Sequence, residues 1–146
     1  MDLTKNHPRS VKHPLAGVIQ AARTCDKARA FNAGALGEYH YNCPMDQALF
    51  RFLGTEHAEF ARKAAELGEA EFEGWLRDAF LSKKSAAEIE RWNREWLAHA
   101  PDKGSEAESY FLDLRDRIAP GRSDITTWAD LLDAEEGRDV PRRHAA

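Results

Sequence analysis

The chain has 146 residues, of which 42% are hydrophobic and 32% are charged, and its formal net charge is −4 at pH 7. This composition is typical of one soluble globular helical domain, and its acidity argues against general binding to nucleic acids or anionic membranes. No apolar run approaches the ~20 residues that span a bilayer, and the N-terminus lacks the apolar core of a secretory signal, so we expect a cytoplasmic protein.

Residues 1–14 are predicted to form an extended arm, because both of their prolines follow histidines in turn-forming pairs. Apolar residues then recur at helical spacing, which predicts a first helix over about residues 15–31. Asp26 falls on the apolar side of this helix, where a carboxylate is unusual. We expect Arg23 or Arg29, one turn away on either side, to pair with it.

A polar loop follows the first helix and concentrates chemically active side chains. Residues 37–46 contain a thiol, an imidazole, two phenols, an amide and two carboxylates. Loops with such a composition are common sites of binding and chemistry. Pro44 is expected to start a short second helix that runs to Leu53, which would make Cys43 its N-cap.

Five further helices are predicted downstream. Thr55 is expected to cap the third helix, and the fourth covers about residues 70–80. Ser85 and Ser105 each precede a glutamate by three residues, a spacing typical of capping boxes, and should open two more helices. Asp124 is expected to cap the last one.

The fold class that these patterns predict is all-α. No segment shows sustained alternation of period two, and valine and isoleucine are scarce, so no sheet is expected. We predict a single compact multi-helix domain of about six to eight short helices over residues 15–138. Residues 139–146 are expected to form a loose tail.

Three side-chain placements follow from the later helices. Trp92 and Trp96 share one apolar helix face and are predicted to be core residues rather than a ligand platform. Asn93 lies on the same face, and a buried amide must find hydrogen-bond partners. The acidic run over residues 133–136 lies near a helix C-terminus, where the helix dipole disfavours it, so we expect a cation such as Arg138 to compensate.

Several segments resemble one known family. They are residues 25–30, 37–42, 46–54, 92–93 and 127–138. Over roughly residues 14–138 the chain resembles the small bacterial proteins grouped as domain of unknown function 5069. The resemblance implies one compact intracellular domain and adds no catalytic residues. It also implies that Asp26, Lys27 and Arg29 belong to a family pattern together with the polar loop.

Cys43 is a candidate nucleophile, because the N-terminus of a helix favours the thiolate form of a cysteine. His40 lies three residues earlier, and a Cys/His pair is one ingredient of nucleophilic catalysis. Asp46 opposes this role, since its carboxylate competes for the same positive helix end. The alternative is a packed cap residue. A disulfide to Cys25 is also open, although we expect both thiols to be reduced in the cytoplasm.

A metal site is a weaker prediction. His40, Cys43 and Asp46, with the more distant His57 or His13, could form a mixed site of nitrogen, sulfur and oxygen ligands. Structural zinc sites usually need two close pairs of ligands, and this chain has one such cluster, so we assign neither a metal nor another cofactor. No GxGxxG, Walker A, HExxH or GxSxG motif occurs, which excludes the classes that these motifs define.

The leading functional prediction is a pocket between the end of the first helix and the loop over residues 39–46, which would bind a small polar or anionic molecule. Asp26 would orient or accept a proton and His40 would shuttle one, with Cys43 as the thiol. Arg29 would hold an anionic group. The other expected ligand contacts are Lys27, Tyr39, Tyr41, Asn42 and Asp46. The alternative is a non-catalytic interaction protein in which the same loop is a structural clamp.

Overall fold

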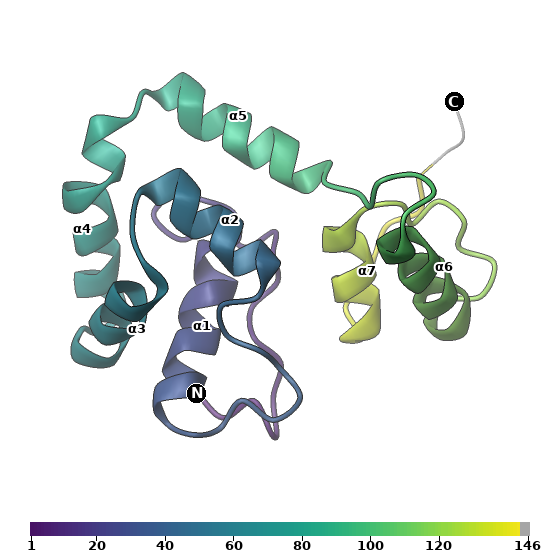
Figure 1. Cartoon of the computed structure of the whole chain (residues 1–146), viewed down its shortest axis with the longest axis horizontal. Helices are drawn as coiled ribbons and strands as arrows, with labels where there is room; N and C mark the ends of the chain where they lie inside the picture. The colour runs from purple at the N-terminus through teal and green to yellow at the C-terminus, as the bar shows by residue number, and fades with distance from the viewer. Residues whose placement is uncertain (144–146) are drawn as a thin grey trace. The chain divides into compact units, whose positions relative to one another are not determined.

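The computed structural model describes residues 1–143 and confirms the all-α fold class (Figure 1). In that part of the chain there are seven α-helices, one short 3-10 helix and no sheet. The helices are α1 (Ala21–Asn32), α2 (Pro44–Leu53), α3 (His57–Glu66), α4 (Glu69–Ala79), η1 (Leu81–Lys83), α5 (Ala86–Leu97), α6 (Glu106–Ile118) and α7 (Trp128–Glu135). None of the described helices is long and apolar enough to cross a membrane.

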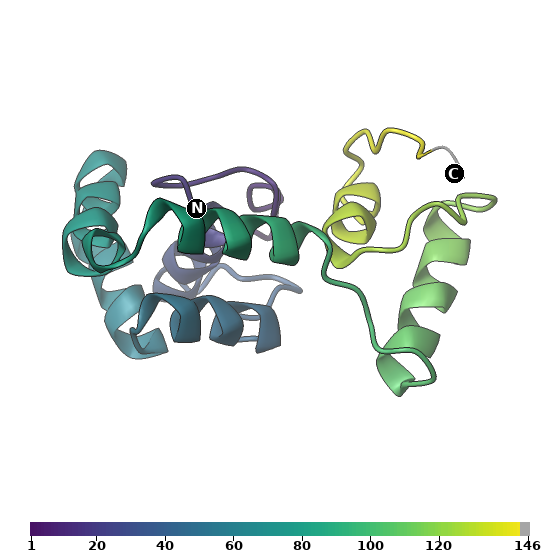
Figure 2. The same cartoon turned by 90° about the horizontal axis from the view of Figure 1, so that it is seen from above.

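The chain divides into two compact units, Met1–Asn93 and Arg94–Ala146. Each unit has its own hydrophobic core. Within the first unit α3 lies at the lower end of α4 in Figure 1, and Figure 2 shows the same helices from above; the rings of Phe60 and Phe72 meet between them at 5.1 Å. The single domain predicted over residues 15–138 stays a prediction, because unfolding measurements must decide whether the two units behave as one.

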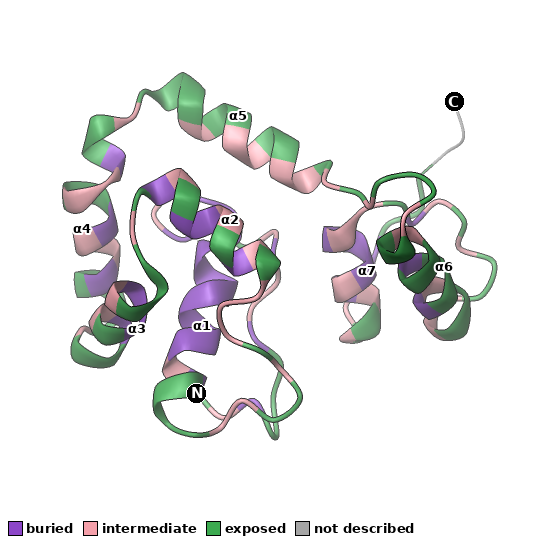
Figure 3. Ribbon diagram, viewed as in Figure 1, coloured by how far each residue is buried: buried purple, intermediate pink, exposed green. Residues whose placement is uncertain are grey.

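α1 is the most buried helix of the first unit, as Figure 3 shows. Its four buried alanines allow neighbouring elements to approach closely. The buried residues also include Arg23, Asp26 and Lys27, and charged side chains are almost never buried unless they are paired. The buried charges of α1 therefore need partners from the segments that pack around it.

The first helix starts at Ala21, six residues later than predicted. Leu15 and Val18 exchange two backbone hydrogen bonds of 3.1 and 3.0 Å, which closes a tight turn. Ala16 and Gln20 adopt positive φ angles of 53° and 79°, which no right-handed helix contains. The apolar residues whose spacing predicted a helix here form a tight turn instead. Their side chains still pack into the core.

α5 secures this turn through two polar side chains. The Oδ1 of Asn93 accepts the N–H of Ile19 at 3.0 Å, and its Nδ2 donates to the carbonyl of Gly17 at 2.9 Å. Trp92 donates its ring N–H to the carbonyl of Ile19 at 3.1 Å and stacks on Phe52 at 4.7 Å. Asn93 thus finds the partners that it was expected to need. The predicted core role holds only in part, because Trp92 is partly buried and packs against the core, whereas Trp96 stacks on His99 at 4.6 Å.

The N-terminal arm, residues 1–14, is packed rather than simply extended. Leu3 and Val11 are only 4% and 1% exposed. The N–H of Leu3 donates to the carbonyl of Ala35 at 2.8 Å. Gly37 lies against the same strip of backbone at φ 61°, and a Cβ there would come within 2.8 Å of the carbonyl oxygen of Leu3. A glycine is therefore required where the arm meets the polar loop.

Local capping signals correctly located three helix starts. Pro44 begins α2, as predicted. The hydroxyls of Ser85 and Ser105 accept the backbone N–H of Glu88 and Glu108, each at 3.1 Å, at the starts of α5 and α6. These bonds join residues only three apart, so this capping signal does not depend on the rest of the fold.

Two predicted caps were wrong. The N-cap of α3 is Glu56, one residue after Thr55. The N-cap of α7 is Thr127, whose hydroxyl accepts a backbone N–H of the first turn at 3.3 Å. Asp124 does not cap that helix, because its carboxylate is held by the guanidinium of Arg122 at 2.9 Å. The same carboxylate also accepts the backbone N–H of Arg143, 19 residues away, at 2.9 Å, so it is not available to cap the helix.

The second unit closes over a small apolar core. Its buried members are Phe111, Leu114, Ile125, Leu131 and Val140. Arg138 lies 3.5 Å from the carboxylate of Asp133 and also binds Glu136 at the end of α7. The expected compensation of the acidic run by Arg138 is thus confirmed.

The C-terminal segment is better packed than the loose tail predicted for residues 139–146. Val140 is 6% exposed. Arg143 donates to the buried carboxylate of Asp130 at 3.0 Å. The remainder of the predicted tail, residues 144–146, lies outside the described residues.

Candidate functional site

A buried network joins α1 to the start of α2. Asp46 is fully buried, and one carboxylate oxygen accepts the hydroxyl of Thr24 at 2.7 Å. The other oxygen lies 2.8 Å from the Nζ of Lys27 and accepts the N–H groups of Asn42 and Cys43 at 3.0 and 3.2 Å. Four donors thus surround one carboxylate, which compensates much of the cost of removing its charge from water.

Cys43 is the N-cap of α2, and its sulfur has an amine rather than an imidazole as its neighbour. The Nζ of Lys27 lies 3.3 Å from the Sγ of Cys43. His40 is exposed, and no hydrogen bond or ion pair links it to any residue in the described part of the chain. The structure therefore does not assemble the expected Cys43–His40 pair.

Asp26 is buried as predicted, but its partner comes from the arm. It accepts the backbone N–H of Arg9 at 2.9 Å and two guanidinium N–H groups of Arg9, both at 3.0 Å. The expected pairing with Arg23 or Arg29 was wrong. Arg23 donates instead to the carbonyl of Arg9 at 3.2 Å. Asp26 therefore fastens the arm to α1, and no hydrogen bond joins it to His40.

Tyr39 connects the loop to the arm. Its hydroxyl and the Nδ1 of His7 are hydrogen-bonded at 2.7 Å. The guanidinium carbon of Arg23 lies 5.7 Å from the centre of the Tyr39 ring, within the range of a cation–π contact. This tyrosine serves as a bridge between two segments far apart in sequence.

Tyr41 turns the other way, toward α3. Its hydroxyl donates to the carbonyl of His57 at 2.6 Å, and its ring stacks on Phe31 at 5.3 Å. Burial raises the pKa of the Tyr41 hydroxyl well above its ordinary value, and the nearby charge of Asp46 adds to the effect. Tyr41 is therefore a neutral hydrogen-bond donor at physiological pH.

The mixed metal site considered from the sequence is not assembled. Within residues 1–143, no three His, Cys, Asp or Glu side chains are grouped so as to hold a metal ion. Asp46 is already surrounded by four donors, and the amine of Lys27 occupies the space next to Cys43. Because a cation and two amide N–H groups already surround these oxygens, the site favours internal pairing over a metal.

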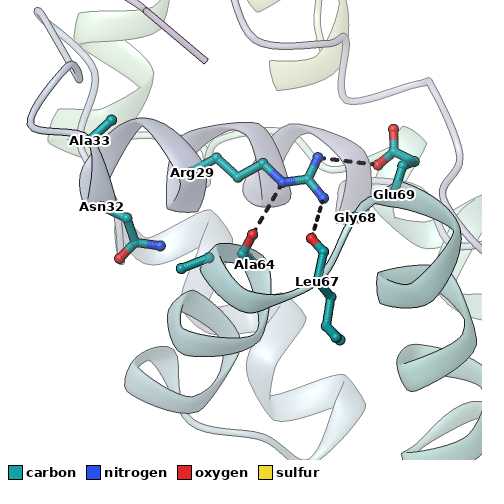
Figure 4. Close-up of a pocket in the computed structure, with 8 residues that line it drawn as sticks. Arg29, Asn32, Ala33, Ala64, Leu67, Gly68 and Glu69 are labelled. Atoms are coloured by element: carbon teal, nitrogen blue, oxygen red, sulfur yellow. Dashed lines mark hydrogen bonds and ion pairs between the residues drawn. The ribbon is translucent and has the colours of Figure 1, made fainter.

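An open groove with a volume of about 510 Å³ lies beside the C-terminal half of α1, between α3 and the start of α4 (Figure 4). We refer to it as the Arg29 groove. The guanidinium of Arg29 donates to the carbonyls of Ala64 and Leu67 at 3.3 and 3.4 Å and lies 3.5 Å from Glu69. Asn32 and Gly68 complete the polar and backbone lining. Three long polar contacts and a cation–π contact with the ring of Phe72, at 5.9 Å, hold the guanidinium.

The carboxylate of Glu69 pairs mainly with Arg9. Two guanidinium nitrogens of Arg9 lie 2.8 and 3.2 Å from its carboxylate oxygens, closer than the 3.5 Å contact from Arg29. Partial burial opposes ionisation of Glu69, but the hydrogen bonds and charge of Arg9, with the charge of Arg29, hold its pKa below its ordinary value. Glu69 is thus shared unequally between two arginines.

A second groove, of about 480 Å³, continues from the first along α3. We refer to it as the Phe31 groove, since it is lined by the stacked rings of Phe31 and Tyr41 together with His57 and Arg62. The two grooves share Asn32 and Ala65 in their linings.

Two of the residues predicted to bind a ligand line these grooves, namely Arg29 and Tyr41. The other predicted site residues line neither of them. They are Asp26, Lys27, Tyr39, His40, Asn42, Cys43 and Asp46. Sequence reasoning missed the contribution of α3, whose alanines leave the grooves open. The only available signal was the abundance of alanine in that helix.

The fold thus defines an all-α protein in which most of the conspicuous polar groups of the first unit bind one another. The family described as domain of unknown function (DUF5069) matches residues 5–138, so the chain belongs to this family. The resemblance noted from the sequence is confirmed, and the match includes the arm residue Arg9 and both grooves. No curated protein matches the chain.

Proposed function

We propose that this protein binds a small carboxylate-bearing molecule in the Arg29 groove. The observation that carries the proposal is the guanidinium of Arg29, which lines an open groove and whose polar contacts are all long, at 3.3–3.5 Å. These distances lie at the outer limit of ordinary hydrogen bonds. The planar fork of an arginine matches a carboxylate, and such charged pairs form bonds of about 2.7–2.9 Å. A ligand carboxylate would therefore bind Arg29 more closely than its present partners do.

Glu69 does not have to lose its charge partner when a ligand binds. Arg9 holds the Glu69 carboxylate at 2.8 Å, independently of the 3.5 Å contact from Arg29. Exchanging the weaker contact for a ligand carboxylate leaves no buried charge unpaired. This makes Arg29 the exchangeable member of the cluster.

The Phe31 groove suggests what else the ligand carries. Phe31 is 52% exposed, and the groove beside it shares Asn32 and Ala65 with the Arg29 groove. An aromatic or aliphatic portion of a ligand anchored at Arg29 would gain contact with the Phe31 ring. The combined grooves are of the size that small-molecule sites usually have. The proposed ligand is therefore an aryl or alkyl carboxylate.

The proposal includes no reaction. Asp26, His40 and Cys43, the residues expected to carry acid–base or thiol chemistry, line neither groove. Asp26 is bound by Arg9, and Cys43 has no imidazole in hydrogen-bonding contact. Binding without catalysis uses the residues that are accessible.

Calorimetric titration with a panel of aliphatic and aromatic mono- and dicarboxylates, with inorganic phosphate as a further anion, tests the proposal. At least one carboxylate should bind the wild type, and Arg29→Ala should weaken that binding at least about tenfold. Arg29→Lys should recover part of it, because lysine keeps the charge but not the fork. Arg77→Ala is the matched control, since Arg77 is an exposed arginine paired only locally with Glu73.

Two outcomes would reject the small-molecule proposal. One is a panel in which no carboxylate binds the folded wild type. The other is a ligand whose affinity is the same for Arg29→Ala and Arg77→Ala. Circular dichroism of each variant shows whether the fold is retained, so that a loss of binding is not mistaken for unfolding.

A second candidate is a non-catalytic interaction protein whose polar loop is a structural clamp, and the observation that favours it is the set of four donors around Asp46. In this case the N–H groups of Asn42 and Cys43 should exchange with deuterium slowly, at a rate limited by unfolding. Asp46→Asn should accelerate their exchange. Fast exchange in the wild type would reject the clamp.

A further inference from the structure

Lys27 and Cys43 bring a primary amine and a thiol into contact at the junction of α1 and α2. The Nζ of Lys27 lies 3.3 Å from the Sγ of Cys43. Asp46 holds the same Nζ at 2.8 Å, and Lys27 is only 5% exposed, so the amine is fixed in position. Cys43 is partly exposed, and hydroperoxides oxidise the thiols that solvent can reach.

We propose that Cys43 and Lys27 form a covalent sulfur–nitrogen crosslink when a hydroperoxide oxidises the thiolate of Cys43. The inference is independent of the ligand-binding function, because it uses a pair of residues that line neither groove. It assigns the buried amine a chemical role beyond pairing with Asp46. The oxidant required is hydrogen peroxide or another hydroperoxide, at one equivalent per crosslink.

The reaction has two balanced steps. First, the Cys43 thiolate attacks one oxygen of hydrogen peroxide, the O–O bond breaks, and the hydroxide that leaves takes a proton from the Lys27 ammonium to form water. This step oxidises sulfur by two electrons to a sulfenic acid and leaves a neutral amine. Second, the amine nitrogen attacks the sulfur, the S–O bond breaks, and the hydroxide takes an N–H proton to form a second water. The products are the S–N bond and two molecules of water.

The crosslink would fasten Cys43, at the start of α2, to Lys27 on α1. Asp46 would lose a cationic partner but keep the hydroxyl of Thr24 and two backbone N–H donors. A thiol reductant attacks the sulfur of such a bond and restores the amine, so the change is reversible. The clamp would then respond to the redox state of its surroundings.

Cys25 provides the competing explanation and therefore the key control. It is fully buried, and burial raises its pKa to about 12, so it should react poorly with peroxide. A Cys25–Cys43 disulfide would nevertheless have the same mass as the S–N crosslink. The decisive experiment therefore uses the full-length Cys25→Ala protein, in which that disulfide cannot form.

The experiment treats Cys25→Ala with hydrogen peroxide and measures the mass of the tryptic peptides. The expected product joins residues 24–29 to residues 30–51 with a combined mass about 2 Da below the sum of the reduced peptides. Trypsin should also fail to cut after Lys27, and dithiothreitol should release the two peptides. Cys25→Ala/Cys43→Ser should give no joined peptide.

Cys25→Ala/Lys27→Arg tests the role of the amine. Arginine keeps a positive charge beside Asp46, but its guanidinium is far less nucleophilic, so oxidation should stop at a sulfenic acid that dimedone traps. Dimedone also distinguishes this product from oxidation of Met45, which lies in the same peptide.

Three outcomes would overturn the inference. The first is oxidation of Cys43 in Cys25→Ala to sulfenic or higher acids without any joined peptide. The second is a joined peptide that persists with the Lys27→Arg substitution. The third is a joined peptide about 14 Da heavier than the reduced sum, which would place an oxygen atom between the two groups instead of a direct bond.

Discussion

Lys27 and Arg29 lie two residues apart on α1, yet they have opposite roles. Lys27 pairs at 2.8 Å with Asp46, which is fully buried, whereas Arg29 lies 3.5 Å from Glu69, whose side chain is 45% exposed. Residues two apart on a helix are about 200° apart around its axis, so one faces α2 and the other faces α3 and α4. The same charge chemistry therefore makes a structural tie on one face and an exchangeable contact on the other.

The largest change in stability is expected on the buried face of α1, where Lys27 pairs with Asp46. Asp46→Ala leaves the ammonium of Lys27 buried without its carboxylate, and we expect the free energy of unfolding to fall by about 3–5 kcal/mol. Urea denaturation followed by circular dichroism measures it. Glu69→Ala is the matched variant on the open side and should cost at most about 1 kcal/mol. Equal costs for the two variants would contradict the distinction between the faces.

The two cysteines give a second measure of burial. The pKa of the Cys25 thiol is raised from its usual 9.0 to about 12 by burial, so its thiolate is about a thousandfold rarer at neutral pH. Cys43, which is partly exposed, should react with iodoacetamide at least about tenfold faster than Cys25 in the folded protein, because Cys25 is both buried and held as the thiol. Mass spectrometry of the labelled peptides gives both rates, and comparable rates would show that the core around α1 opens readily.

A third, smaller effect concerns the arm. Asp26→Asn removes the charge that binds Arg9 but keeps a side chain of the same shape, and we expect a loss of about 1.5–3 kcal/mol. Glu66→Gln is the control, because Glu66 is exposed and paired only with Arg62 on the same helix. If Asp26→Asn cost no more than Glu66→Gln in urea denaturation, the arm would not depend on this ion pair.

The smallest effect is expected for the pH dependence of the contribution that Glu69 makes to stability. The pKa of Glu69 is lower in the folded protein than its ordinary 4.5, so the folded state binds fewer protons there than the unfolded state. Its contribution to stability is fully present above about pH 4.5 and is lost as the pH falls through the folded pKa. Because the carboxylate is 45% exposed, we expect less than about 1 kcal/mol.

Glu69→Gln isolates this contribution. The difference in unfolding free energy between the wild type and the variant should shrink between about pH 6 and pH 3. A difference that grows as the pH falls would reverse the assigned direction of the pKa shift.

The capping errors show why some starts of helices were predictable and others were not. Ser85 and Ser105 bind glutamates three residues away, and within residues 1–143 the hydrogen-bond partners of their hydroxyls all lie within three residues in the chain. Asp124 had the right residue type for a cap, but Arg122 and the backbone N–H of Arg143 occupy its carboxylate. A local signal predicts structure only where no stronger partner competes for the same atoms.

In the candidate site, too, local features could be predicted from the sequence and long-range partners could not. The sequence indicated that Asp26 is buried, because its place on an apolar helix face follows from spacing alone. It could not indicate Arg9 as the partner, since Arg9 lies 17 residues earlier in a segment without periodicity. It also could not indicate the Arg29 groove, whose walls come from α1, α3 and α4 and are open because α3 carries small side chains.

By itself, the sequence determined the all-α class, the family, the N-cap of α2 and the positions where charges enter the core. These properties depend on residues a few positions apart, whose geometry a helix or a cap specifies directly. The tertiary structure decided which charges pair, which of them stay accessible and that Cys43 faces Lys27 rather than His40. Those outcomes depend on the direction in which each helix face points once the helices have packed, and no local pattern contains that direction.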